Sequence, residues 1–107
     1  MAQYNEHQVI QAIRNGLQAQ STGCRGGCGR AYICLSHTES KQALNIFKKA
    51  VTASGLRYLG KAYGILSKRT AYVGYDNADG RALAQAEQIA KNLKQLGLDC
   101  YYDCAGD

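Results

Sequence analysis

A short pattern occurs twice in this chain, and the repeat limits the folds that the chain can adopt. Ala31-Tyr32-Ile33 starts one copy, and Ala71-Tyr72-Val73 starts the other, forty residues later. In each copy a polar turn follows, then an amphipathic helical pattern, a glycine (Gly55 or Gly97) and a short aromatic strand pattern. Each copy predicts strand–helix–strand. Two copies in tandem predict a ferredoxin-like α+β sandwich, βαββαβ, with an antiparallel sheet.

The repeat occupies most of the chain, and we expect residues 1–107 to form a single domain. A capping-box spacing followed by apolar residues at helical intervals predicts an extra N-terminal helix over 5–20. Glycine and cysteine dominate 21–29, which is typical of a loop. The predicted βαββαβ core then spans 30–104.

The chain shows no sign of a targeting or membrane-spanning segment. Its first residues have neither a basic start nor an apolar run, so we predict no signal peptide. No stretch approaches the roughly eighteen apolar residues of a transmembrane helix. The default expectation is a cytoplasmic protein without a membrane partner.

The charge of the chain is unevenly distributed along the sequence. The formal net charge is +5. From Arg25 to Arg69 there are nine Lys or Arg residues and one acid, Glu39, whereas the residues after Arg69 include three basic residues and six acids. This asymmetry predicts a basic face that meets an anion, with nucleic acid as the first candidate. The alternative is a solvated surface whose charge is simply uneven.

The strand patterns place several tyrosines on the sheet face that points away from the helices. Alternation puts Tyr32 and Cys34 of the first predicted strand on that face. In the third predicted strand, alternation puts Tyr72 and Gly74 there and turns Tyr75 towards the helices. Aromatic rings on an uncovered sheet face are platforms on which bases stack.

Both strand motifs are similar to those of the RNA-recognition-motif family. Ala31-Tyr32-Ile33-Cys34-Leu35 resembles the first-strand motif of that family, with Tyr32 at the stacking position. Lys68-Arg69-Thr70-Ala71-Tyr72-Val73-Gly74-Tyr75 partly resembles the third-strand motif, but Arg69 replaces the usual glycine and Thr70 replaces an aromatic residue. The order and spacing of the elements also agree. The resemblance implies that an open sheet face binds single-stranded RNA.

The predicted interface combines stacking with phosphate contacts. A base stacked on an exposed tyrosine gains about 1–3 kcal/mol without sequence readout. Basic side chains on the second strand and at the predicted hairpin tip are placed to contact phosphates. The predicted nucleic-acid-binding residues are Tyr32, Tyr72, Arg57, Lys61, Lys68 and Arg69.

Two structural alternatives and one functional alternative compete with this interface. The N-terminal helix, or a second copy of the chain in a homodimer, can cover the open face and bury its tyrosines. Because no catalytic motif is present, we expect a non-enzymatic protein. A compact chain without motifs also fits a small inhibitor or adaptor, such as a phage or mobile-element protein that binds a host nucleic-acid-handling complex.

The five cysteines form two Cys-x-x-x-Cys pairs, Cys24/Cys28 and Cys100/Cys104, with Cys34 between them. In the predicted sheet the first and last strands are antiparallel neighbours, so Cys24 and Cys28 approach Cys104. Three states remain open: free thiols, a disulfide such as Cys28 to Cys104, or a structural zinc site from Cys24, Cys28, Cys104 and a fourth ligand. A metal or redox protein is therefore a further alternative. Apart from this zinc, no cofactor is predicted.

Overall fold

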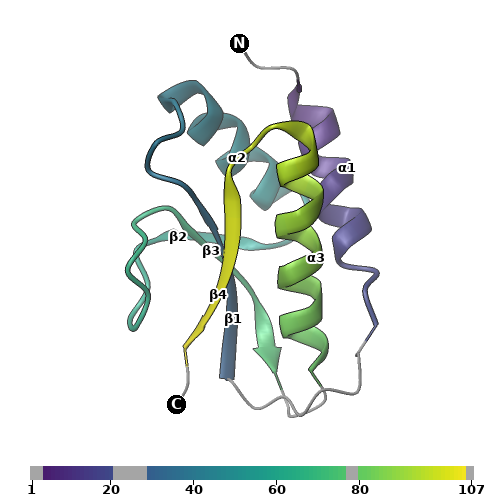
Figure 1. Cartoon of the computed structure of the whole chain (residues 1–107), viewed down its shortest axis with the longest axis vertical. Helices are drawn as coiled ribbons and strands as arrows, with labels where there is room; N and C mark the ends of the chain where they lie inside the picture. The colour runs from purple at the N-terminus through teal and green to yellow at the C-terminus, as the bar shows by residue number, and fades with distance from the viewer. Residues whose placement is uncertain (1–3, 21–28, 77–79, 106–107) are drawn as a thin grey trace.

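The computed structural model describes residues 4–20, 29–76 and 80–105. After an N-terminal helix, the described elements follow the strand–helix–strand–strand–helix–strand order that the repeat predicts (Figure 1). The elements are α1 (Glu6–Gly16), β1 (Gly29–Leu35), α2 (Lys41–Ala53), β2 (Arg57–Gly60), β3 (Thr70–Asp76), α3 (Arg81–Leu96) and β4 (Cys100–Ala105).

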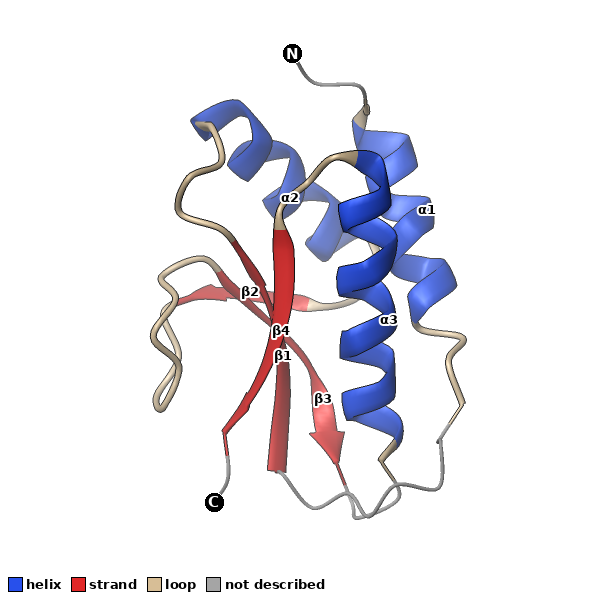
Figure 2. Ribbon diagram, in the orientation of Figure 1, coloured by secondary structure: helices blue, strands red, loops and turns tan. Residues whose placement is uncertain are grey.

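The strands form one antiparallel sheet in the order β2-β3-β1-β4. Helix α3 packs on β1, β3 and β4, and α2 packs on β2. All three helices lie on one side of the sheet (Figure 2), and we call the opposite side the outer face. A small α+β fold with an open antiparallel sheet is therefore confirmed, while membership of the ferredoxin-like class stays a prediction.

Helix α1 lies beside α2 and α3 and does not cover the outer face. Its buried residues Val9 and Ile13 join the core between the helices and the sheet. The predicted capping box is present: the Asn5 side chain accepts from the Gln8 backbone N–H, and the Gln8 side chain accepts from the Asn5 N–H, both at 2.9 Å. The helix ends at Gly16, earlier than the sequence predicted, because glycine is a poor helix former.

The main core fills the space between the sheet and the three helices. Alternation along β1 is as predicted, with Ala31, Ile33 and Leu35 facing the helices. Apolar stripes on the helices close over them, as expected for amphipathic helices. The largest fully buried side chains from the helices are Val9, Ile13, Phe47, Val51, Ile89 and Leu93.

A β-bulge interrupts the alternation in β3. Ala31 pairs with Gly74, but the next residue of β1, Tyr32, pairs with Tyr72, so Val73 is the extra residue. Gly74 therefore faces the helices, where a Cβ would lie 3.6 Å from the Cβ of Ala82. Tyr75 pairs with Arg30 and is turned towards the outer face. The predicted orientations of Gly74 and Tyr75 were wrong, because strict alternation along a strand does not allow for an inserted residue such as Val73.

Candidate nucleic-acid interface

The connection between β2 and β3 covers the middle of the outer face. We call residues 61–69 the β2–β3 loop; it lies on the side of the sheet away from the helices (Figure 1, left). Ala62 and Ile65 are its buried anchors, and they pack against Tyr32 and Cys34 of β1 in a second, smaller apolar cluster. The cover of the outer face is therefore this loop, and not the N-terminal helix that the sequence offered as an alternative.

Tyr32 is buried beneath the loop, with only 2% of its surface exposed. Its ring meets that of the half-buried Tyr72 edge to face, with the centroids 5.6 Å apart. A base cannot stack on a ring that is enclosed in this way. The expectation that Tyr32 is open to solvent was therefore wrong, because an irregular loop that folds back onto the sheet leaves no periodic signal.

Glycine allows the loop to approach the sheet closely. Gly64 has a φ of +83°, a backbone conformation that L side chains rarely adopt. A Cβ at this position would lie 3.3 Å from the Cβ of Ala105 at the end of β4. The loop thus extends from the β2 edge of the sheet to β4.

Three of the four predicted phosphate-binding residues are exposed. Arg57 pairs with Tyr72 in the sheet register, so it lies on the outer face at the β2 edge. Lys61 and Lys68 lie exposed near the two ends of the loop. Two of the three cations therefore lie on the loop that carries the buried anchors, and the third lies at the adjoining edge of the sheet.

Arg69 has a structural position that the sequence did not reveal. Its Nη1 donates to the carbonyl oxygens of Ser36 at 3.1 Å and Glu39 at 2.9 Å. The side chain is half-buried and ties the start of β3 to the turn between β1 and α2. These hydrogen bonds occupy part of the guanidinium that was expected to contact phosphate.

Sequence reasoning missed the two most exposed apolar side chains of the described chain. Tyr63 is 89% exposed and Leu66 is 99% exposed, and both project from the β2–β3 loop. The sequence signal for such a loop was the lack of alternation in this segment, together with its two glycines, Gly60 and Gly64. In the structure both glycines have positive φ values. A tyrosine is therefore present on the basic surface, but it is Tyr63, between Lys61 and Lys68 in sequence.

The opposite edge of the sheet carries acidic groups. Asp103 of β4 pairs with Tyr32 and therefore faces outward, and Asp99 precedes the strand and is exposed. The β2 edge and the loop have basic side chains, while the β4 edge has carboxylates. A polyanion is attracted to the first region and repelled by the second.

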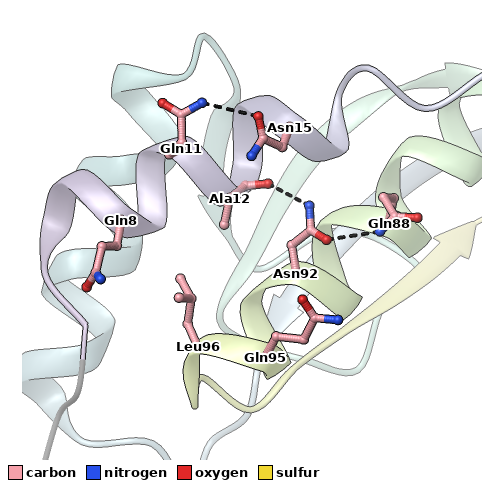
Figure 3. Close-up of a pocket in the computed structure, with 8 residues that line it drawn as sticks. All are labelled: Gln8, Gln11, Ala12, Asn15, Gln88, Asn92, Gln95 and Leu96. Atoms are coloured by element: carbon pink, nitrogen blue, oxygen red, sulfur yellow. Dashed lines mark hydrogen bonds between the residues drawn. The ribbon is translucent and has the colours of Figure 1, made fainter.

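A separate hollow of about 500 Å³ lies between α1 and α3 (Figure 3). Its amide side chains hydrogen-bond to one another and to the helix backbone; for example, Asn92 Nδ2 donates to the carbonyl of Ala12 at 3.0 Å. The bond from Asn92 joins the two helices, whereas the Gln11–Asn15 and Gln88–Asn92 bonds each lie within one helix. These amides provide no charge for an anion. The lining residues are Gln8, Gln11, Ala12, Asn15, Gln88, Asn92, Gln95 and Leu96.

The cysteines of the described chain are free thiols, and two of them are completely buried. Cys34 lies on the outer side of β1, with its Sγ 3.8 Å from Thr70 Oγ1, and Cys100 lies in the helix-side core. Burial raises the pKa of both thiols. A raised pKa opposes thiolate formation, so Cys34 is not an activated nucleophile.

The predicted metal and disulfide sites lie largely outside the described chain. Cys24 and Cys28 are outside the described residues, and Cys104 is a free thiol. Within residues 4–20, 29–76 and 80–105 no three His, Cys, Asp or Glu residues form a group that can hold a metal ion. The zinc site stays a prediction.

The buried thiols predict that the protein loses stability at alkaline pH. An unfolded thiol loses its proton near pH 8.5, whereas folded Cys34 and Cys100 keep theirs to higher pH. The unfolded state therefore binds fewer protons above about pH 8.5, and the free energy of unfolding falls there by up to about 1.4 kcal/mol per pH unit for each thiol. Below that pH neither thiol contributes to the slope.

Urea unfolding under reducing conditions at about pH 7 and about pH 9.5 measures this slope, before most tyrosines titrate. The double variant Cys34→Ala/Cys100→Ala is the control, because its slope is expected to be flatter whatever its absolute stability. Equal slopes for the two proteins would show that the buried thiols are not responsible.

Comparison with known proteins gave no match: no protein-family model, no curated protein and no solved structure is significantly similar to the chain. None of the described helices is both long and apolar enough to cross a membrane. The site must therefore be interpreted from its own chemistry.

Proposed function

We propose that this chain is a small, non-enzymatic, cytoplasmic binding protein that contacts single-stranded nucleic acid, RNA in the first instance, through the β2–β3 loop. We also propose that its fold belongs to the ferredoxin-like class, since β1 and β3 are the central strands and β4 borders β1. The contact surface consists of Tyr63 as the stacking ring and of Arg57, Lys61 and Lys68 as the phosphate-contacting groups.

The observation that carries this proposal is the exposure of Tyr63 among cations. Its ring is 89% exposed on a loop whose neighbouring anchors, Ala62 and Ile65, are buried. The loop is therefore fixed to the sheet while its aromatic ring points outward. Because the loop backbone is anchored, a base can stack on this ring without the added entropic cost of ordering the loop, and stacking tolerates any base sequence.

The surrounding charges fit a phosphate backbone. Lys61 and Lys68 flank the ring in sequence, and Arg57 lies at the adjoining edge of the sheet. Strands of nucleic acid bind such surfaces largely by counterion release, so their affinity depends strongly on salt. The carboxylates at the β4 edge favour a strand path along the β2 side of the loop.

The variant Tyr63→Ala is expected to weaken binding of a single-stranded oligonucleotide by about 1–3 kcal/mol, which is about 5- to 150-fold. Fluorescence anisotropy with a labelled RNA and the same DNA sequence measures the affinity. Tyr102→Ala is the matched control, since Tyr102 is also an exposed tyrosine but lies on β4. Equal losses for the two variants, or no binding by the wild type at low salt, would contradict the proposed surface.

Charge reversal tests the phosphate contacts independently of stacking. Lys68→Glu is expected to lower affinity and to reduce the slope of log affinity against log salt by about 0.7, the value for one phosphate contact to a single strand. Lys91→Glu on α3 introduces the same change of charge away from the loop and should leave the slope unchanged.

A second candidate function is favoured by Leu66. An aliphatic side chain that is 99% exposed offers little to a polyanion but is typical of a protein contact. It supports the alternative that the chain is a phage or mobile-element inhibitor or adaptor that binds a nucleic-acid-handling protein. In that case Leu66→Ser abolishes capture of the protein partner, while Tyr63→Ala leaves oligonucleotide affinity low and unchanged.

A further inference from the structure

A hollow of about 610 Å³ lies where the β2–β3 loop meets the turn between β1 and α2. A volume of this size is typical of a site for a small ligand. Its lining combines a histidine, a lysine, an arginine, a serine and a tyrosine, and among the described residues that line it there is no acid. The lining residues are His37, Leu66, Ser67, Lys68, Arg69 and Tyr101.

The strand register brings these residues together from distant parts of the sequence. Cys34, near the end of β1, pairs with Thr70 on one side and Tyr101 on the other. His37 follows Cys34 by three residues, and Lys68 precedes Thr70 by two. The imidazole, the ammonium group and the phenol therefore belong to three segments that meet at one end of the sheet.

Hydrogen bonds fix the walls of the hollow. Arg69 Nη1 binds the carbonyls of Ser36 and Glu39, which joins the loop to the turn that contains His37. Ser67 Oγ accepts from the Arg69 backbone N–H at 3.0 Å. A binding site whose walls are already cross-linked loses little entropy when it takes up a ligand.

The charge at the hollow is positive, although acids lie on the flanking segments. Lys68 is exposed, and the guanidinium of Arg69 lines the wall. Glu39 Oε2 accepts from the backbone N–H of Asp99 at 2.7 Å, and neither acid lines the hollow. A group with two negative charges is attracted here more strongly than a group with one.

We propose that this hollow binds the terminal monophosphate of a nucleotide, either free or at the 5′ end of a strand. A phosphate monoester carries about −1.5 to −2 charges at neutral pH, more than the single charge of an internal phosphodiester. Lys68 and His37 donate hydrogen bonds to the phosphate, and the ring of Tyr101 provides the surface for the attached sugar or base. The strand-end form of this inference rests on the proposed function, whereas the free-nucleotide form does not.

Two oligonucleotides that differ only in their 5′ ends test the inference. The probes are strands of about eight nucleotides, within the usual site size, labelled at the 3′ end and carrying either a 5′-phosphate or a 5′-hydroxyl. We expect the phosphate to improve affinity by about tenfold, as one or two charge-assisted hydrogen bonds do. His37→Gln should abolish this advantage and leave affinity for the 5′-hydroxyl strand unchanged. His7→Gln, a change of the other, also exposed histidine, should have no effect.

Calorimetry with a nucleoside 5′-monophosphate and its unphosphorylated nucleoside separates the two proposals. If both strands bind equally and the monophosphate does not bind, the inference is overturned and the proposed function stands. If neither strand binds but the monophosphate binds and His37→Gln weakens it, the hollow is a nucleotide site and the proposed function fails. If nothing binds, both are wrong.

Discussion

Replacing Tyr32 by alanine is expected to destabilise the protein by about 3–4 kcal/mol, the usual cost of removing a buried aromatic side chain. The ring is 2% exposed and lies between β1 and the β2–β3 loop. Its removal leaves a cavity beneath Ala62 and Ile65 and deletes the edge-to-face contact with Tyr72. The loss has two physical parts, the transfer of the ring to water and the unfilled cavity.

The matched control for this substitution is Tyr101→Ala. Tyr101 lies on the same outer face, in the neighbouring strand, but is 40% exposed, so its loss should cost clearly less than that of the buried Tyr32. Chemical unfolding followed by circular dichroism gives both values. If Tyr32→Ala were as mild as Tyr101→Ala, the outer face would be open and the loop would not be its cover.

The Tyr32→Ala variant also separates a core role of Tyr32 from a binding role. If Tyr32 belongs to the core, the affinity of the folded fraction for an oligonucleotide should not change in Tyr32→Ala, because Tyr63 provides the stacking ring. A drop in affinity of about fivefold or more with little loss of stability is what a stacking residue would show. That result would restore the platform that the sequence predicted and remove the β2–β3 loop as its replacement.

The parts of the fold that could be predicted from the sequence are those with a regular spacing of apolar residues. The repeated Ala-Tyr pattern predicted the order of strands and helices, and the inward-facing residues of β1, such as Ile33, were as expected. Residues 61–66 have no period, so the sequence could not show that Ile65 lies on Tyr32 while Tyr63 points to solvent. Burial in an irregular loop depends on tertiary contacts that pattern analysis does not detect.

The candidate site was predicted in its charge but not in its geometry. Lys61 and Lys68 are exposed, as a basic surface requires. Arg69 lies just before β3, near the predicted hairpin tip, yet its guanidinium donates hydrogen bonds to two carbonyls of the β1–α2 turn. Whether an arginine binds a ligand or its own backbone depends on which carbonyl groups the fold brings within reach, and this information is absent from the charge pattern.

A large loss of stability is also expected from a substitution at the contact between α1 and α3. Gly16→Ala is expected to destabilise the protein by about 2 kcal/mol, within the range known for overpacked cores. An added Cβ at Gly16 would lie 2.8 Å from the Cα and N of Ile89, and closer still to its side chain. Because two of these atoms belong to the backbone of α3, a change of rotamer cannot relieve the overlap, and the two helices must move apart.

The sign of this effect separates packing from helix propensity. In an isolated helix, alanine is favoured over glycine by about 1 kcal/mol, so propensity alone predicts a gain in stability. Asn15→Ala, one residue earlier on the exposed side of α1, is the matched control and should be neutral or slightly stabilising. In thermal unfolding, the melting temperature of Gly16→Ala should fall by about 4–8 °C for each kcal/mol of lost stability. A rise in the melting temperature would mean that α1 does not approach α3 as closely as Gly16 permits.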